Sequence, residues 1–131
     1  FYDYPDGIRF GVENPDLKEI IENERLNNNI TLKKFSEQEI LRRYMAAMIN
    51  EAADVVDEGI ALRPSDVDVT LLYGYGFPRY RGGPLKYADM YGLEKLVKDI
   101  KEFEKEDPIF WSLSPLLERL ARENKTFDSL N

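Results

Sequence analysis

The sequence predicts an all-α domain with a short N-terminal strand or hairpin extension. Three observations support this fold class. Apolar residues recur at helical spacing in successive segments from residue 36 onward. Capping residues, prolines and glycines stand at the ends of these segments. The first ten residues instead alternate aromatic and polar side chains. We therefore divide the chain into residues 1–35, an extension with a linker, and residues 36–131, a helical domain.

The N-terminal stretch "FYDYPDGIRF" predicts two short strands joined by a tight turn. Its residues 4–7 place a proline before Asp-Gly, which favours such a turn. Residues 11–34 are polar and read as a linker. Within them, "PDLKEIIENERL" predicts a short helix, because helical spacing is kept by Leu17, Ile20, Ile21 and Glu24.

The strongest helical signal follows a capping box, "SEQE". Ser36 is placed to accept from a backbone amide, and Glu39 to reach back to the cap. Gly59 provides the stop. Such a long helix needs other elements to cover its apolar stripe, which comprises Ile40, Leu41, Tyr44, Met45, Met48, Ile49, Ala52, Ala53 and Val56.

The segment "RPSDVDVTLLYG" is ambiguous, because its valines and threonine favour a strand. Ser65 and Asp68, however, make a second capping arrangement, and acidic residues in a first turn suit the positive end of a helix dipole. We predict a helix that ends at Gly74.

Three more helices are predicted in the C-terminal half. The first begins at Pro84 behind Gly83 and ends at Gly92. The second is amphipathic and is stopped by the Asp-Pro pair at residues 107–108, and the third opens at the Ser-Pro pair at residues 114–115. The apolar positions of the last two helices are Leu93, Leu96, Val97, Ile100, Phe103, Leu116, Leu117 and Leu120.

The composition excludes several kinds of chemistry. The chain has no cysteine, so disulfides, thiolate catalysis and zinc-thiolate sites are excluded. It has no histidine, so histidine-dependent nucleophile systems cannot be assembled from this chain alone. No signal-peptide pattern occurs, and no run approaches the roughly 20 apolar residues of a membrane span. These features favour a reducing, cytoplasmic location without a membrane span.

The net charge of −7 makes the chain a poor candidate for nucleic-acid binding, whose affinity depends on phosphate neutralisation. The charge is uneven, because no acidic residue stands between Asp68 and Asp89, whereas Arg79, Arg81 and Lys86 do. Tyrosines and a phenylalanine are interleaved there as on a stacking surface for single strands, but packing is the favoured role.

The basic stretch contains "GYGFPRYRGGP", residues 74–84. It is not a dinucleotide fingerprint, because the third glycine is replaced by Arg79 and a predicted helix precedes it. One hypothesis is that Arg79 and Arg81 clamp a phosphate with the amides at the start of the next helix, beside Gly82 and Gly83. The other is a sharp packing corner whose arginines meet acidic partners or solvent.

No metal site is predicted. The candidate carboxylates lack EF-hand spacing and are expected to be solvated or to cap helices: Asp54, Asp57, Glu58, Asp66 and Asp68. Asn50 and Glu51 are expected at the boundary of the long helix's apolar stripe rather than in catalysis.

The order of "NEAADVVDEGIA", "RPSDVDV" and "GYGFPRYRGGP…YAD…GL" resembles the C-terminal domain of the 3-hydroxyacyl-CoA dehydrogenases. It is most similar to the second copy of that domain in multifunctional β-oxidation enzymes, the fatty oxidation complex alpha subunits. The ending "PIFWSLSPLLERLARENKTFDSLN" resembles the family's last segment, and "FYDY" the end of the first copy. The resemblance implies that residues 1–35 are the tail of a preceding domain plus a linker.

The resemblance also implies a helical domain of the 6-phosphogluconate-dehydrogenase C-terminal type. In that family a Rossmann domain binds NAD and carries a histidine–glutamate pair, while the helical domain completes the acyl-CoA cleft and mediates pairing. An active-site asparagine of the first copy aligns with Arg42, so no catalytic residue is carried over. We expect no cofactor on this fragment and NAD in the parent enzyme.

The implied function is the C-terminal domain of an enoyl-CoA hydratase and NAD-dependent 3-hydroxyacyl-CoA dehydrogenase. The fragment is expected to pack on the preceding dehydrogenase domains, or to form a homodimer, and to be inactive alone; acyl-CoA is the parent's substrate. Two alternatives stay open. One is a free-standing helical dimerisation module, and the other is an accessory domain that binds the CoA phosphate through Arg79 and Arg81.

Overall fold

The computed structural model describes residues 2–7 and 9–131 and divides into two compact units, Phe1–Phe35 and Ser36–Asn131. Phe1 and Ile8, which belong to the predicted hairpin, lie outside the described residues. Each unit has its own secondary structure.

The first unit contains the predicted hairpin and helix. Strands β1 (Tyr2–Asp3) and β2 (Val12–Glu13) pair antiparallel, with Tyr2 opposite Glu13. Helix α1 (Leu17–Asn27) follows, and none of its residues is buried. The Asn14 side chain links the hairpin to the start of α1, because it donates to Asp3 at 3.2 Å and accepts from the Asp16 amide at 2.8 Å.

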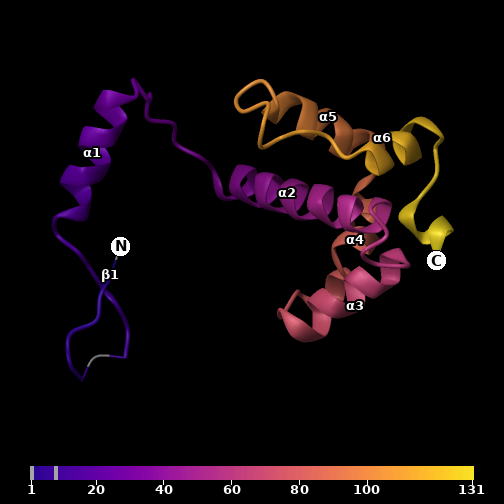
Figure 1. The fold of residues 1–131 in the computed structure, drawn as a ribbon, viewed down its shortest axis with the longest axis horizontal. Helices are drawn as coiled ribbons and strands as arrows, with labels where there is room; N and C mark the ends of the chain where they lie inside the picture. The colour runs from indigo at the N-terminus through magenta and orange to yellow at the C-terminus, as the bar shows by residue number, and fades with distance from the viewer. Residues whose placement is uncertain (1, 8) are drawn as a thin grey trace. The chain divides into compact units, whose positions relative to one another are not determined.

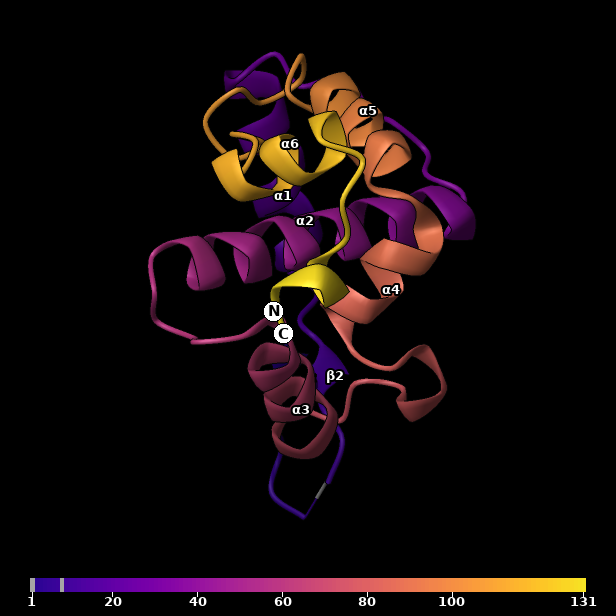
Figure 2. The same cartoon turned by 90° about the vertical axis from the view of Figure 1, so that its right-hand side faces the viewer.

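The second unit is helical, as predicted. Its helices are α2 (Glu37–Asp57), α3 (Pro64–Gly74), α4 (Pro84–Tyr91), α5 (Leu93–Phe103) and α6 (Pro115–Arg122), with short 3₁₀ helices η1 (Arg79–Arg81) and η2 (Phe127–Leu130). Helix α2 runs through the middle of this unit, with α5 and α6 on one side and α3 and α4 on the other (Figures 1 and 2). Helix η2 packs against α3 and α4.

One hydrophobic core holds these helices together. Phe103 and Phe127 are its largest fully buried side chains, and the Phe103 ring lies 4.9 Å from that of Trp111. Each α-helix of this unit contributes to the core or packs against it, and the central helix α2 supplies Met45, Ala46, Ile49, Ala52 and Ala53. Burial of this apolar surface is the main force that assembles the unit.

Two capping predictions have different outcomes. Ser36 accepts from the Glu39 amide at 3.2 Å, which confirms the cap of α2. The helix predicted at residues 64–74 is also confirmed, but its predicted cap, Ser65 with Asp68, is wrong. Because α3 begins at Pro64, its N-cap is Arg63, and Asp66 accepts from the Arg63 amide at 3.1 Å. Asp68 has another partner, described below.

The amphipathic helix ends earlier than predicted. Helix α5 stops at Phe103 rather than at the Asp-Pro pair of residues 107–108. Asp107 instead shapes the following turn, since its carboxylate accepts from the amides of Ile109 at 3.1 Å and Phe110 at 3.0 Å. The last helix begins as predicted and buries Leu116, Leu117 and Leu120. None of the helices in the part of the chain that the structure describes is long and apolar enough to cross a membrane.

Asn50 is buried rather than at the boundary, with 8% of its surface exposed. Its amide donates to the Ser112 carbonyl at 2.8 Å and accepts from the Ser114 backbone amide at 2.9 Å. These two bonds join α2 to the segment that leads into α6.

Asn50→Ala is expected to lower the free energy of unfolding by about 2 kcal/mol or more, because both backbone groups would lose their buried partner. Ser114→Ala is the matched control. The Ser114 hydroxyl is buried without a hydrogen-bond partner among the described residues, so its removal is expected to be neutral or stabilising. Urea unfolding followed by circular dichroism measures both. Equal losses in the two variants would contradict this account of Asn50.

Candidate functional site

The basic segment forms a corner between α3 and α4. We call residues 74–84 the corner segment. Its backbone is left-handed at Gly76, Gly82 and Gly83, whose φ angles are 70°, 77° and 108°. Residues with a Cβ adopt such angles only with strain, so these positions favour glycine. Phe77 is buried in the core, whereas Tyr75 is 79% exposed. The packing-corner interpretation therefore accounts for the glycines.

Asp68 explains why a glycine stands directly before Pro84. Its carboxylate accepts from the amides of Leu85 at 2.8 Å and Lys86 at 3.0 Å, at the N-terminus of α4. A Cβ on Gly83 would overlap the Asp68 carboxyl group. Only a glycine lets this acid from α3 reach the start of α4. Burial raises the pKa of Asp68, and the two amide hydrogen bonds oppose that rise.

The same hydrogen bonds bear on the phosphate hypothesis. Two of the amides expected to assist Arg79 and Arg81 already donate to the Asp68 carboxylate. An anion at this corner would therefore be held by the arginine side chains without those two amides. CoA-phosphate contact at Arg79, Arg81, Gly82 and Gly83 stays a prediction.

The two arginines lie on tyrosine rings. The Arg79 guanidinium is 5.2 Å from the centre of the Tyr73 ring, and that of Arg81 is 4.8 Å from the Tyr87 ring. Arg81 also donates through Nε to the Tyr80 hydroxyl at 3.2 Å. Within the described residues, neither arginine has a carboxylate within ion-pair distance. Both arginines are therefore stacked on tyrosine rings, and neither forms an ion pair with an acidic side chain of the described residues.

An apolar groove of about 440 Å³ adjoins Arg81. Its walls are Leu41 and Tyr44 of α2, Leu71 of α3 and Tyr80 of the corner segment. Tyr44 and Tyr80 are 59% and 81% exposed, so this apolar wall faces outward.

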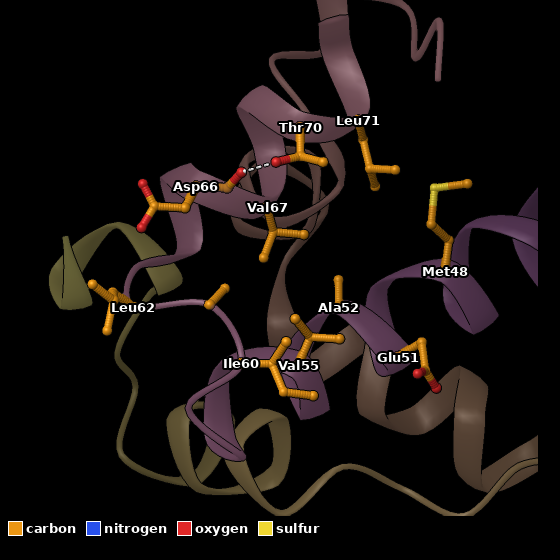
Figure 3. Close-up of a pocket in the computed structure, with 11 residues that line it drawn as sticks. Met48, Glu51, Ala52, Val55, Ile60, Leu62, Asp66, Val67, Thr70 and Leu71 are labelled. Carbon is orange, nitrogen blue, oxygen red and sulfur yellow. Dashed lines mark hydrogen bonds between the residues drawn. The ribbon is translucent and has the colours of Figure 1, made fainter. Parts of the chain in front are cut away.

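A second groove, of about 610 Å³, continues along α2 (Figure 3). Ala52 and Val55 of α2 face Val67 of α3 across it, and residues 60–62 close one end. The Asp66 carboxylate turns away from the apolar side chains (Figure 3) and pairs with Arg63 at 2.7 Å.

The two grooves share Met48 and Leu71 and so form one surface, which we call the α2–α3 face. This surface corrects one expectation about α2. The predicted apolar stripe is covered only in part, because Ile40, Leu41 and Tyr44 are 55%, 43% and 59% exposed. Helix α2 is apolar on two sides. One side packs in the core, and the other lines the α2–α3 face.

Arg42, where the family's asparagine would align, has a structural role. It contacts Asp99 of α5 at 3.3 Å, and its guanidinium lies 4.8 Å from the Phe103 ring centre. Asp99 is 7% exposed and accepts a hydrogen bond of 2.6 Å from the Tyr91 hydroxyl. Burial, with the hydrogen bond to Asp99 and its charge, raises the pKa of Tyr91 to about 12. Arg42 thus ties α2 to α5.

The described residues form neither a dinucleotide turn nor a cluster of acidic side chains. The glycines follow helix α3, and the strands of the described residues form only a two-stranded antiparallel hairpin. A dinucleotide turn needs a parallel strand before its glycines. Across residues 2–7 and 9–131, no group of three or more acidic side chains converges on a point where a metal would bind.

Sequence reasoning missed the role of Asp68 and the Arg42–Asp99–Tyr91 network. A signal for the first was present. Helix α4 begins behind Gly83, which has no side chain to cap it, so its first amides need a partner from elsewhere, such as an acidic side chain. The Arg42–Asp99–Tyr91 network had no comparable signal in the sequence, because its members stand on three different helices.

The chain is similar to known proteins over most of its length. The family described as 3-hydroxyacyl-CoA dehydrogenase, C-terminal domain, matches residues 40–128. The chain is 38% identical over 122 residues to the peroxisomal bifunctional enzyme of Danio rerio, and 36% identical over 124 residues to that of Homo sapiens. These matches cover 92% and 93% of this chain but 17% of each relative.

A bacterial relative is also similar. The fatty acid oxidation complex subunit alpha of Vibrio vulnificus is 36% identical over 97 residues, which are 73% of this chain and 14% of that protein. The chain therefore spans about a sixth of the length of these relatives or less.

Gly83→Ala is expected to lower the free energy of unfolding by about 2–4 kcal/mol, because the new Cβ meets the Asp68 carboxyl group and the φ angle is left-handed. Gly74→Ala is the control. No atom lies within 4 Å of its added Cβ, and the residue is helical, so stability should stay the same or rise slightly. Chemical denaturation measures both. A Gly83→Ala protein as stable as Gly74→Ala would refute the steric account.

Tyr91 should titrate separately at high pH. Its folded-state pKa, about 12, exceeds the ordinary value of about 10. The stabilisation from this phenol is therefore complete below about pH 10 and is lost as the pH rises toward 12. Absorbance at the wavelength of tyrosinate should contain a late step that disappears in Tyr91→Phe. A late step that survives in that variant would assign it to another tyrosine and contradict the prediction.

Proposed function

Since the chain belongs to the family of 3-hydroxyacyl-CoA dehydrogenase C-terminal domains, we propose that it is the pairing domain of a multifunctional fatty-acid oxidation enzyme. In this proposal the parent protein is an NAD-dependent 3-hydroxyacyl-CoA dehydrogenase with enoyl-CoA hydratase activity, and it acts on acyl-CoA. The chain itself has a structural role and does not catalyse the reaction alone.

The observation that carries the pairing role is the α2–α3 face. A helical unit with a complete core normally leaves few large contiguous apolar surfaces exposed, and such surfaces mark interaction sites. Here the outer side of α2 exposes Leu41 and Tyr44, and Ile60 and Leu62 are 72% and 88% exposed. A neighbouring domain that covers this face would bury these side chains.

The non-catalytic role is supported by the chemistry that the chain offers. It has no histidine or cysteine, and the strands of the described residues form no parallel sheet that a dinucleotide turn would need. The ion pair of Arg42 with the buried Asp99 ties helices together. The proton and hydride transfers of the parent reaction are assigned in this proposal to the preceding domains.

The match to these relatives supports a parent of several domains, because the chain corresponds to 17% of the Danio rerio and Homo sapiens proteins. Those two relatives are named peroxisomal. The cytoplasmic location expected for this chain stays a prediction.

The isolated chain is expected to be folded and inactive. Circular dichroism should report a mainly helical protein, and acetoacetyl-CoA with NADH should give no absorbance change above the buffer rate. An intact 3-hydroxyacyl-CoA dehydrogenase serves as the positive control for the assay. Turnover that depends on the chain's concentration would refute the non-catalytic role.

The pairing role is tested in the parent protein. Removal of residues 36–131 is expected to lower its thermal midpoint and its dehydrogenase activity, because the surface that this domain covers would be exposed. Addition of the separate chain should restore part of both. A truncated parent with unchanged stability and activity would show that this domain does not support its neighbours.

A further inference from the structure

Three helices of the second unit receive no cap from their own N-cap residue. Within the described residues, Arg63 before α3, Gly83 before α4 and Thr126 before η2 place no side-chain acceptor on the first amides that follow. The first amides of a helix have no partner inside the helix, so each of these starts needs an acceptor from elsewhere. In all three cases a side chain of another element supplies one.

Two of these acceptors are aspartates. Asp68 of α3 caps the start of α4, as described above. Asp89, near the end of α4, caps η2 in the same way. Its carboxylate accepts from the amides of Phe127 at 2.8 Å and Asp128 at 2.9 Å, which are the first two residues of η2. Each aspartate thus holds the start of the element that packs against its own helix.

The third acceptor closes the series. Asn131, which follows η2, accepts through Oδ1 from the amide of Ser65 in the first turn of α3, at 2.9 Å. Its Nδ2 donates to Asp128 at 3.3 Å, which orients the amide group. Helix α3 therefore caps α4, α4 caps η2, and the end of η2 caps α3; the three elements lie next to one another (Figure 2). We call the side chains of Asp68, Asp89 and Asn131, with the elements that they join, the cap ring.

Polar contacts rather than apolar burial hold α3 in the ring. Among the described residues of α3, only Pro64 and Asp68 are buried, whereas α5 and α6 bury several leucines each. Helix η2 is anchored differently, because Phe127 is 1% exposed and belongs to the core. Lys86 adds a second link between α4 and η2 through an ion pair of 3.6 Å with Asp128.

Each cap exists only while both of its elements are in place. If η2 moves, Asn131 leaves the start of α3, and the amides of η2 leave Asp89 in the same step. If α3 then moves, the carboxylate of Asp68, which is 8% exposed, loses the amides of α4. A buried acceptor without its partners is costly, so the intermediate arrangements are unfavourable. Elements linked in this way open together, as one cooperative unit.

The ring also spans two surfaces of the molecule. The corner segment connects α3 to α4, so the caps position both of its ends. It carries Arg79 and Arg81, and α3 forms one wall of the groove that contains Val67. A change at η2 therefore reaches both surfaces through α3 and α4.

We propose that the cap ring is a cooperative conformational device, through which residues 127–131 hold the corner segment and the α2–α3 face in shape. The ring has a closed state, in which all three caps are made, and an open state, in which α3, α4 and η2 are loosened together. Withdrawal of the tail from Ser65 favours the open state. This inference concerns a motion inside the unit, and it goes beyond the proposed function without depending on it.

Hydrogen–deuterium exchange of the full chain, read by mass spectrometry, tests the cooperativity. Asn131→Ala removes one exposed side chain and one hydrogen bond to α3. It should raise the exchange rate of protected amides throughout α3, α4 and η2 by a common factor of about five, as expected for the loss of one hydrogen bond. Exchange in α2, α5 and α6 should stay the same.

Ser129→Ala is the matched control for Asn131→Ala. The Ser129 hydroxyl donates to the Thr126 carbonyl at 2.6 Å, so its removal also costs one hydrogen bond in η2, but none to α3. This control should leave exchange in α3 and α4 unchanged. An equal rise in α3 and α4 for both variants would overturn the role of the Asn131 contact.

Asp89→Ala is compared with Asp107→Ala. Both aspartates accept from two successive backbone amides, but Asp107 does so in the turn after α5, outside the ring. Asp89→Ala should raise exchange in α3, α4 and η2 at least about tenfold, since two hydrogen bonds are lost. Asp107→Ala should leave these three elements unchanged. Circular dichroism checks the fold, and Asp89→Asn, which keeps one acceptor oxygen, replaces Asp89→Ala if that variant unfolds.

A double variant separates one cooperative ring from three independent caps. Once Asp89→Ala has released η2, the contact of Asn131 with α3 is already lost. Adding Asn131→Ala should then change exchange in α3 by less than about twofold, so the two effects are not additive. Independent caps would instead multiply the two factors.

Proteolysis gives a readout at the corner segment, far along the chain from the substitution. Trypsin cuts after arginine, and cleavage after Arg81 requires the corner segment to open locally. Mass spectrometry should detect this cut about five times faster in Asn131→Ala than in Ser129→Ala. Equal rates would show that the tail does not control the corner segment.

The remaining outcomes also decide the matter. A rise in exchange confined to the first turn of α3 would show that the caps act singly and would overturn the ring. An even rise across all helices of the unit would show general destabilisation and would overturn it as well. Neither result bears on the activity assay or on the truncated parent, which test the proposed function separately.

Discussion

The carboxylate of Asp68 is the contact on which the geometry of the corner segment depends. Asp68 stands on α3, and its carboxylate accepts hydrogen bonds from the first free amides of α4. This contact sets the position at which α4 begins relative to α3. This contact requires Gly83, because a side chain there would occupy the position of the carboxyl group. Once the corner is set, Phe77 enters the core and the tyrosines and arginines are left outside. A capping interaction thereby determines which surface the molecule presents.

Helix α2 plays two roles because it is apolar on two sides. Its inner side meets α4, α5 and α6 in the core, and the Arg42–Asp99 contact and the Asn50 hydrogen bonds hold it there. Its outer side lines the α2–α3 face. A helix used only inside this unit would need one apolar stripe. The second apolar stripe is explained if another domain packs on it. This explanation agrees with the finding that the chain spans a small part of the length of its relatives.

Much of the fold was predictable from local signals. Ser36 before a long amphipathic segment, Pro84 behind Gly83, and Pro115 behind Ser114 each mark a helix start that the structure contains. The errors lie where a side chain has more than one possible partner. Asp68 could cap its own helix by sequence, but α4 offers amides without any cap, and burial between the helices favours that contact. Helix α5 also ends before the predicted stop, and the segment after it places the Trp111 ring against Phe103.

By itself the sequence determined the helical class, the hairpin, the family resemblance and the lack of histidine and cysteine, because periodicity, capping and composition are local properties. Only the tertiary structure decided that Asp68 caps another helix, that Arg42 binds Asp99, and that the first part of the α2 stripe is left outside the core. These features depend on how the helices pack against one another. Helix packing is determined by contacts between residues far apart in the chain, and a local sequence pattern does not report such contacts.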